Sequence, residues 1–509
     1  MDFNSSWHGH TFAEVEASIK QAMLGKQDTI TDIDDIRAGA SSGSTALQPE
    51  DLKINYTNPV GPWRPDPCVW KGDDGYFYLK GTGRLNTVLR TRDLVNWEDT
   101  GRTFVSAEAE ESLFTLYGHY ATDDSTYKLQ PNYWAPFVIK IGSNWVMYLA
   151  VVERTGTKSE PVNGAAHIVA FTSKTPYGDF ENPVTIVSDG DFKITNTVVW
   201  NNVIDPFVYY DSKVNKLYLV AGSSYSIGCV ELTEDGLSTV LSKGVGNKAI
   251  RLGGLTISSD PNRWAVYEGA YVYARPYNGQ TYYYLFASMG DWATRDYAVV
   301  VGRSLNSNDG SYVDKHGINL ITGNKSMSLA RRILSTESET STFWGPGHIG
   351  GIFETEDGKT WMLYHCHDGS GEQDRKLFIQ ELLWDENGWP YFGNNGHPVE
   401  SGMISKGIIT DTPHITNKEA RSTSNVVFIS GDVGCTQEHL DDDQTFIPDV
   451  GQPTRQDAIA AYKQGKTVLL INESYDQCVQ ITGWNSEQNM IYLGGTFETS
   501  SGGTDIWPW

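Results

Sequence analysis

Three acidic residues and one histidine open stretches of similar sequence in this chain. Each stretch has an apolar strand, a polar or glycine-containing turn and an aromatic strand, and the five opening residues are Asp66, Ala135, Asp205, Glu268 and His348. If such repeats close around an axis, their opening residues face one another across a central funnel. Crowded carboxylates raise the pKa of at least one member of the group. A protonated acid beside an ionised one is the pair that glycoside hydrolysis needs.

Taken singly, these residues have simpler interpretations. Asp66 and Asp205 each precede a proline, which commonly marks a turn or a strand boundary. Glu268 precedes Gly269 and can be an ordinary loop carboxylate, while a lone histidine such as His348 is more often a packed or capping side chain. The shared register, with acids at three of five equivalent positions, favours a common site.

The spacing of the opening residues indicates which element positions them. Consecutive openings lie 63 to 80 residues apart, and each interval holds four short strands with loops, the size of one propeller blade. Short runs rich in Tyr, Val, Trp and Ile alternate with turn signals such as GDDG and EDGK. The sequence therefore predicts an all-β fold, with a five-bladed β-propeller over residues 58–402.

The two ends of the chain have different patterns. Residues 8–26 carry apolar residues at helical spacing before a glycine stop, and a looser stretch follows. Residues 1–57 are therefore predicted to be an N-terminal helix and a linker. Residues 403–509 are predicted to form a small accessory domain, β-rich or α/β, with a short helix, a buried strand and a hairpin.

Composition narrows the class of partner. The 509 residues include 39 Lys plus Arg against 63 Asp plus Glu, a net charge of −24, which disfavours nucleic acid and an anionic membrane surface. Aromatic residues make up 12% of the chain and suit both sheet cores and sugar stacking. The five cysteines have no CxxC spacing, so neither a zinc site nor a disulfide framework is indicated. A neutral or weakly charged substrate fits best.

The motifs also resemble a known family. RPDPCVW, NYWAPFV, VIDPFVYYD, YEGAYVYARP, VVVGRS, WGPGHIG and LLWDENGWP, in that order, are similar to glycoside hydrolase family 43, most closely to its endo-acting α-1,5-L-arabinanases, over residues 58–400. The resemblance implies that Asp66 is the general base, that Asp205 orients the acid and modulates its pKa, and that Glu268 is the general acid. It also implies inversion at the anomeric carbon, with a water held between base and sugar.

The same resemblance suggests a metal and a substrate platform. His348, in WGPGHIG, matches a family histidine that faces a hydrated cation, usually calcium, in the channel. Calcium prefers oxygen ligands, so water molecules would have to complete such a site. Trp134, before Ala135, matches a substrate-platform position, although a core tryptophan is about as common an explanation.

Some residues depart from the family pattern. Pro65 and Arg64 stand where a histidine often precedes the base motif. After the acid's strand, Tyr297 matches a family tyrosine and is assigned to substrate binding, whereas Trp292 and Arg295 are unexpected bulky residues. They would line the substrate cleft and narrow it, which makes short oligosaccharides or an end-acting mode plausible.

The function predicted from sequence is internal hydrolysis of α-1,5-linked L-arabinan in plant cell walls. An exo-acting α-L-arabinofuranosidase or β-xylosidase of the same fold is the first alternative, and a propeller that binds glycans without cutting them is the second. An invertase-like enzyme is disfavoured, since its RDP and Glu-Cys motifs are replaced by IDP and Glu-Gly. The N-terminus lacks a leader-like pattern. The substrate class nevertheless predicts a secreted, cell-surface or periplasmic protein.

Overall fold

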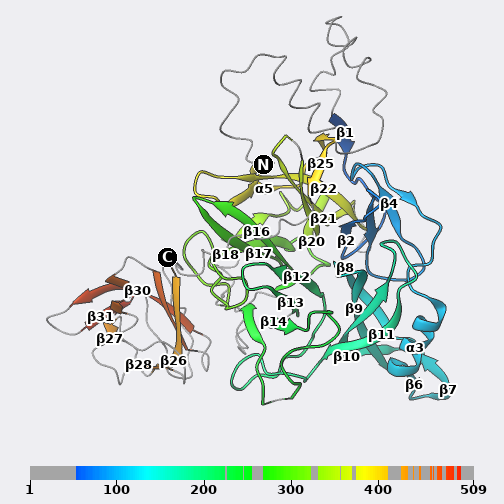
Figure 1. Ribbon diagram of the computed structural model, residues 1–509, viewed down its shortest axis with the longest axis horizontal. Coiled ribbons are helices and arrows are strands. Elements are labelled where there is room, and N and C mark those ends of the chain that lie inside the picture. The colour runs from blue at the N-terminus through cyan, green and yellow to red at the C-terminus, as the bar shows by residue number, and fades with distance from the viewer. Residues whose placement is uncertain are drawn as a thin grey trace, which may run out of the picture. The chain divides into compact units, whose positions relative to one another are not determined.

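The computed structural model describes most of the predicted propeller and parts of the C-terminal region (Figure 1). The described residues are 53–410, with gaps at 224–225, 245, 255–266, 322–330, 356 and 370–373, and portions of 426–493. The chain divides into two units, Met1–Lys53 and Ile54–Trp509. The helix and linker expected within residues 1–57 lie almost wholly outside the described residues, so they stay predictions, as do the domain limits.

Five antiparallel sheets form the blades of a β-propeller, which confirms the predicted fold class and blade number. Blade 1 contains β2 (Cys68–Lys71), β3 (Phe77–Lys80), β4 (Leu89–Thr91) and β5 (Glu98–Asp99). Blade 2 contains β8 (Asn132–Ile141), β9 (Asn144–Gly156), β10 (Pro161–Ser173) and β11 (Glu181–Ser188). Blade 3 contains β12 (Phe207–Asp211), β13 (Lys216–Ala221), β14 (Ile227–Leu232) and β15 (Ile250–Gly253).

The remaining two blades complete the ring. Blade 4 contains β16 (Tyr267–Tyr277), β17 (Gln280–Met289), β18 (Ala298–Ser304) and β19 (Arg332–Leu334). Blade 5 contains β20 (Phe343–Thr355), β21 (Thr360–Asp368), β22 (Arg375–Trp384) and β23 (Pro390–Phe392), and β25 (Ile408–Thr410) pairs with β20 as a fifth strand. A short helix, α5 (Gly393–Gly396), follows β23.

The ring is closed by the segment that precedes blade 1. β1 (Lys53–Thr57) pairs with β24 (Ser401–Ser405). The buried Asn58 side chain then pairs with the backbone of β22 as a neighbouring strand would. Its Nδ2 donates to the Ile379 carbonyl at 2.9 Å, and its Oδ1 accepts from the Ile379 N–H at 2.9 Å. The Arg64 N–H donates to the Arg375 carbonyl at 3.0 Å. Blade 5 is thereby held next to the strand opening of blade 1.

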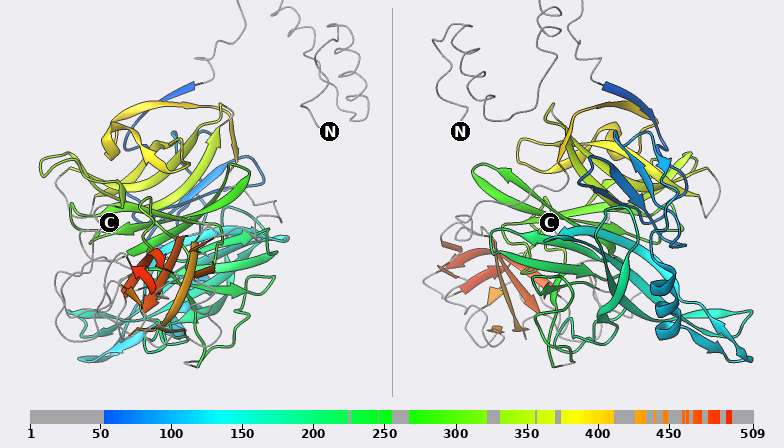
Figure 2. Two further views of the ribbon diagram at one scale, coloured as in Figure 1. Left: turned by 90° about the vertical axis from the view of Figure 1, so that its left-hand side faces the viewer. Right: turned by 45° about the vertical axis from the view of Figure 1, so that its right-hand side comes forward.

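A helix and a hairpin connect blades 1 and 2. The helix α3 (Ala107–Tyr117) begins after Ser106, whose hydroxyl accepts a hydrogen bond from the Ala109 N–H as an N-cap. The hairpin of β6 (His119–Ala121) and β7 (Asp124–Leu129) follows, and it projects at the edge of blade 2 (Figure 2). No described helix is long and apolar enough to cross a membrane.

Aromatic side chains join blades 2, 3 and 4 near the middle of their first strands. The ring centroids of Phe137 and Phe207 lie 4.7 Å apart, and those of Phe207 and Tyr271 lie 4.4 Å apart. Packing of this kind adds about 0.5–1.5 kcal/mol per pair beyond the buried area. We call Phe137, Phe207 and Tyr271 the aromatic row. It separates the two ends of the first strands.

The described part of the C-terminal region is a six-stranded sheet in the order β27-β31-β30-β29-β26-β28. Its strands are β26 (Val426–Val433), β27 (His439–Leu440), β28 (Phe446–Pro448), β29 (Thr467–Asn472), β30 (Gln477–Asn485) and β31 (Met490–Leu493). The predicted strand and hairpin are confirmed as β29 and as the antiparallel pair β30 and β31. The short helix predicted before them falls largely outside the described residues.

Candidate active site

In each blade, one residue just before or within the first strand lies in the left-handed backbone region. The φ angles are 51° at Asp66, 40° at Ala135, 56° at Asp205, 57° at Gly269 and 46° at His348. Such angles are uncommon for residues other than glycine and cost about 1–3 kcal/mol each. Ala135 adopts the angle without a functional side chain, so the conformation belongs to the ring architecture.

The backbone corrects the predicted register of blade 4. The residue equivalent to Asp66 and Asp205 is Gly269, because it carries the left-handed φ of 57°. Glu268 therefore lies one position earlier than the alignment of apolar residues indicated. A Cβ on Gly269 would lie 3.0 Å from His348 Nδ1. This close approach, together with the positive φ, favours glycine at that position.

Hydrogen bonds between neighbouring blades hold the opening residues in place. In three of them, the backbone N–H donates to a side chain on or just after the second strand of the preceding blade. The bonds are Ala135 N to Thr82 Oγ1 at 2.9 Å, His348 N to Ser288 Oγ at 2.6 Å, and Asp66 N to His365 Nδ1 at 3.0 Å. Because His365 Nδ1 accepts this bond, the neutral His365 ring carries its proton on Nε2.

Asp66 is the carboxylate with charged support. Arg375 Nη1 lies 3.0 Å from its Oδ1, and His348 Nδ1 lies 3.4 Å from the same oxygen. The Thr82 hydroxyl donates to Oδ2 at 2.6 Å. Burial alone raises the pKa of Asp66, but Arg375, His348 and the Thr82 hydrogen bond together outweigh burial and hold this pKa below its usual value. Asp66 is therefore ionised in the folded protein near neutral pH.

Among the described residues, the hydrogen-bond partners of Glu268 are neutral hydroxyl groups. The Ser223 hydroxyl donates to Oε2 at 2.8 Å, and the Tyr297 hydroxyl donates to Oε1 at 2.7 Å. Burial raises the pKa of Glu268, and the Asp66 charge adds to this, although the two hydroxyl donors work in the opposite direction. The result is a carboxyl group that keeps its proton to higher pH than an exposed glutamate does.

Asp205 is close enough to both of the other acids for their charges to affect its pKa. Its side chain is buried, and its Oδ2 accepts the Gly269 N–H at 3.1 Å. Burial raises the pKa of Asp205 well above its usual value, and the charges of Glu268 and Asp66 raise it further. The hydrogen bond to Gly269 ties Asp205 to the backbone directly beside Glu268. The structure thus brings the three predicted acids into one electrostatically coupled group.

Comparisons with known proteins agree with this geometry. The sequence profile of Glycosyl hydrolases family 43 matches residues 56–390. The chain belongs to this family. Among its relatives, an extracellular endo-α-(1→5)-L-arabinanase of Thermotoga petrophila is 25% identical over 64% of this chain and 69% of its own length. An extracellular exo-α-(1→5)-L-arabinofuranosidase of Cellvibrio japonicus is 24% identical over 64% of this chain and 85% of its own length.

A solved structure supports the fold of this family 43 chain. The crystal structure of endo-1,5-α-L-arabinanase from Thermotoga petrophila RKU-1 has a TM-score of 0.50 at 22% identity. It covers 67% of this chain and 75% of the other chain. At this identity, the likeness concerns the fold alone.

The predicted substrate-binding residues of the family 43 site lie in different surroundings. Tyr297 is fully buried and contacts the acid Glu268, so the structure gives no support to its predicted direct contact with substrate. Trp292 lies against Arg375, with the guanidinium carbon 4.1 Å from the ring centroid. Arg295 donates to the Ser341 carbonyl at 3.0 Å and so braces a loop. Trp134 is half-buried in β8 and packs against apolar core residues, and its platform role stays a prediction.

The predicted calcium ion was compared with the donor atoms around His348. Calcium takes about six to eight oxygen ligands, whereas the groups that contact Asp66, next to His348, are two imidazoles, a guanidinium and the single hydroxyl of Thr82. Within the described ranges, no group of three or more His, Cys, Asp or Glu side chains could hold a metal ion. The residues present do not fit a directly coordinated calcium. A hydrated ion next to His348 stays a prediction, and no step of the reaction is derived from it.

Sequence reasoning missed three residues of the site, Arg375, Thr82 and His365. Thr82 follows β3 in a GTG turn, and His365 is part of a His-x-His pattern in β21, which is an unusual sequence for a buried strand. Those two sequence patterns could have identified Thr82 and His365 as candidate site residues. Arg375 had no such pattern, because it meets Asp66 across 309 positions of sequence through ring closure.

Proposed function

We propose that this family 43 hydrolase cleaves α-1,5-linked L-arabinan internally with inversion of anomeric configuration. The observation that carries the proposal is the difference in partners between two acids of one buried group. Asp66 is paired with a guanidinium, and Glu268 is held by two neutral hydroxyls. An ionised base and a protonated acid on either side of a sugar ring are the requirements of inverting glycoside hydrolysis.

The residues act in a defined order. Asp66 removes a proton from a water molecule, and that water attacks the anomeric carbon from the face opposite the leaving group. Glu268 donates its proton to the glycosidic oxygen as the bond breaks. Asp205 accepts a hydrogen bond from the Gly269 N–H and so orients the backbone next to Glu268. When Asp205 is ionised, its negative charge raises the pKa of Glu268. Both acids then exchange protons with solvent to restore the starting state.

The choice of arabinan rests on the relatives. Two bacterial relatives, at 25% and 28% identity, are named endo-α-(1→5)-L-arabinanases. Because the relative named as an exo-α-(1→5)-L-arabinofuranosidase is 24% identical, end-acting hydrolysis is the second candidate.

A product analysis tests the proposal and its alternative. Debranched arabinan is incubated with the wild-type chain and with Glu268→Gln, and products are resolved by chain length. Internal cleavage gives a ladder of oligosaccharides at early times, whereas end-acting cleavage gives one short product from the start. If Glu268→Gln retains wild-type turnover, the proposed mechanism with Glu268 as the acid fails. If the wild type releases no reducing ends from arabinan, xylan or aryl glycosides, hydrolysis itself is excluded. Binding without cleavage would then be the remaining function.

Two further expectations belong to this proposal. Relatives named extracellular support action outside the cell, where a cell-wall polysaccharide is met. A hydrated calcium ion near His348 is tested by removing metal with a chelator and measuring both the melting temperature and turnover. Restoration by calcium after a loss supports the ion, and unchanged values for both quantities contradict it.

A further inference from the structure

A second hollow lies at the other end of the first strands. It is a pocket of about 1060 Å³ lined by parts of β2, β8, β12 and β16 and by residues of β9, β13, β14 and β17. These strands begin at the active site and run away from it, so Tyr210 lies five residues beyond Asp205, about 16 Å at 3.3 Å per residue. All three residues of the aromatic row line this pocket, whereas Asp66, Asp205 and Glu268 do not. The pocket is therefore separate from the acids.

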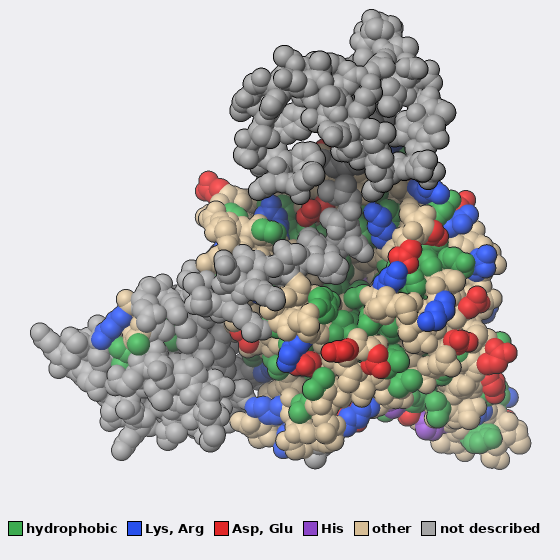
Figure 3. Space-filling view, in the orientation of Figure 1, with side chains coloured by type: hydrophobic (Ala, Val, Ile, Leu, Met, Phe, Trp, Pro, Cys, Tyr) green, Lys and Arg blue, Asp and Glu red, His purple; other side chains and the backbone are tan. Residues whose placement is uncertain are grey.

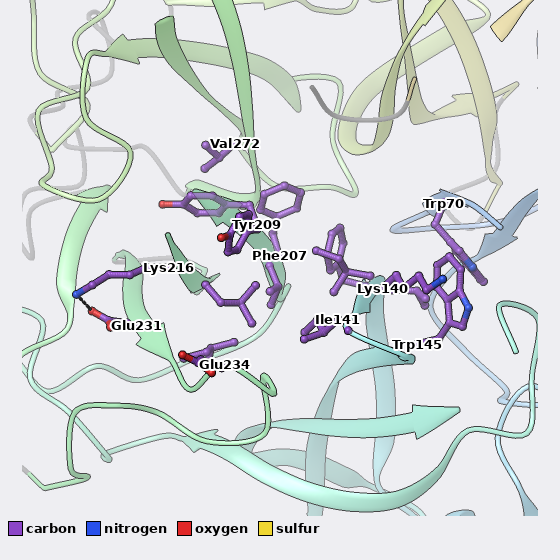
Figure 4. Close-up of a pocket in the computed structure, with 18 of the residues that line it drawn as sticks. Trp70, Lys140, Ile141, Trp145, Phe207, Tyr209, Lys216, Glu231, Glu234 and Val272 are labelled. Atoms are coloured by element: carbon purple, nitrogen blue, oxygen red, sulfur yellow. Dashed lines mark hydrogen bonds and ion pairs between the residues drawn. The ribbon is translucent and has the colours of Figure 1, made fainter. Parts of the chain in front are cut away.

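The pocket is elongated and has an aromatic floor. Figure 4 shows Lys216, Glu231 and Glu234 at one side, Phe207 and Tyr209 in the middle, and Lys140, Trp145 and Trp70 at the other. Tyr210, which also lines the pocket, is 39% exposed, so its ring is accessible to a ligand. Figure 3 shows hydrophobic side chains near the middle of the visible face, with acidic and basic ones around them. An extended ligand fits this shape better than a compact one.

The charged residues of the pocket balance. Three are basic and three are acidic: Lys71, Lys140, Lys216, Asp73, Glu231 and Glu234. Lys140 Nζ lies 2.7 Å from Asp73 Oδ2, and Lys216 Nζ lies 2.6 Å from Glu231 Oε2. This balance occurs in a chain whose net charge is −24. A ligand with a strong charge of either sign gains little here, whereas hydroxyl groups can bond to both ammonium and carboxylate atoms.

We propose that this pocket is a second binding site for a neutral oligosaccharide, of the class that the proposed hydrolase cleaves. The inference rests on the proposed function for its choice of sugar. The apolar face of a sugar ring lies on Tyr210, the exposed aromatic side chain of the pocket, while the hydroxyls bond to the charged rim. The volume is close to the upper end of ordinary ligand pockets, roughly 300–1,000 Å³. The pocket holds part of a glycan away from the bond that is cut.

Calorimetric titration with linear α-1,5-arabinotriose tests the proposal. The protein is the full chain carrying Glu268→Gln, which prevents hydrolysis during the titration. Two binding events per chain are expected. Adding Tyr210→Ala is expected to weaken one event at least fivefold and to leave the other within error. Glu234→Gln changes an exposed carboxylate and is the second variant. If Tyr210→Ala strongly lowers the melting temperature, the test rests on whether Glu234→Gln weakens the same binding event.

Tyr391→Ala is the matched control, because Tyr391 is a similarly exposed tyrosine, at 44%, on another blade. It is expected to change neither event. A single event per chain overturns the proposal, and so do two events that both Tyr210→Ala and Glu234→Gln leave unchanged. A dimer in sedimentation that Tyr210→Ala dissociates also overturns it, since a second copy then covers the pocket. Absence of arabinan cleavage by the wild type instead contradicts the proposed function, whatever the number of binding events.

Discussion

The two ends of the first strands differ in how far their charged side chains are buried and in how far opposite charges compensate them. At the openings, the carboxyl groups of Asp66, Asp205 and Glu268 are buried together, and among the described residues only Asp66 has a cationic side chain within hydrogen-bonding distance. At the other end, acidic and basic residues are equal in number, and two pairs are partly exposed. Burial without full compensation is what shifts a pKa. The chemistry is therefore expected at the openings.

Backbone conformation adds to this difference. Four non-glycine residues at the openings adopt a left-handed φ, whereas among the described residues that line the far pocket only Gly142 and Asn215, both in turns between strands, do so. The strained backbone at the openings is held by N–H groups that donate hydrogen bonds to the side chains of Thr82, Ser288 and His365. One strand can therefore have a strained backbone at its reactive end and an unstrained backbone at the end proposed to bind a ligand.

The largest effect is expected from the acid itself. Glu268→Gln keeps the shape and the Ser223 and Tyr297 contacts but cannot donate a proton from a carboxyl group. Turnover is expected to fall by about 10²–10⁴-fold, the usual contribution of general acid catalysis. Initial rates on debranched arabinan measure it, with the melting temperature as a check on folding. A fall of less than about fivefold would break the assignment of chemistry to the openings.

The next effect concerns the charge beside the base. Arg375→Met removes the guanidinium that lowers the pKa of Asp66, so that pKa rises and more of the base is protonated at a given pH. The acid limb of the kcat/KM profile is expected to move to higher pH by about 1 unit or more. Arg375→Lys keeps a positive charge and should shift the acid limb of the profile less than Arg375→Met does. An unchanged acid limb in Arg375→Met would contradict the role of the pair.

A smaller effect is expected from the Thr82 hydroxyl, which accepts from Ala135 N and donates to Asp66 Oδ2. Thr82→Val leaves the N–H without its acceptor and the carboxylate without its donor. A hydrogen bond to a charged group contributes about 1.5–3 kcal/mol, so kcat/KM is expected to fall tenfold or more. Thr82→Ser retains the hydroxyl and should retain most of the activity. Equal losses in both variants would point to packing instead.

Replacing Tyr297 is expected to shift the basic limb of the kcat/KM pH profile without shifting the acid limb. Its hydroxyl bond lowers the pKa of Glu268, because it stabilises the ionised form. Tyr297→Phe therefore raises that pKa, and the basic limb of the profile is expected to move to higher pH, while the acid limb stays in place. Rate measurements across the alkaline range show the shift. Movement to lower pH would reverse the inferred sign.

The smallest effect is expected at the far end. Lys140→Met removes a pair whose side chains are 41% and 60% exposed. Exposed pairs contribute about 0–1 kcal/mol, so the free energy of unfolding is expected to change by less than about 1 kcal/mol in a urea titration. A loss of several kcal/mol would mean that charges at this end are as strongly coupled as those at the openings.

The sequence by itself determined the all-β class and the five blades, and it predicted the three acids that the structure brings together. Apolar periodicity, turn residues and repeated openings are local features, and each blade must bury its faces against its neighbours. The family 43 resemblance supplied roles for Asp66, Asp205 and Glu268. Local pattern also led to an error, because it aligned Glu268 with the opening position, which the backbone assigns to Gly269.

Only the tertiary structure decided which groups surround the acids. Arg375 and His365 reach Asp66 from blade 5, about three hundred positions later in sequence, because the ring closes there. Tyr297, predicted to bind substrate, is turned toward Glu268 and buried. The pKa of a carboxyl group depends on burial and on charges a few ångströms away. Such neighbours are set by how distant strands pack, so the sequence could name the acids but not their protonation.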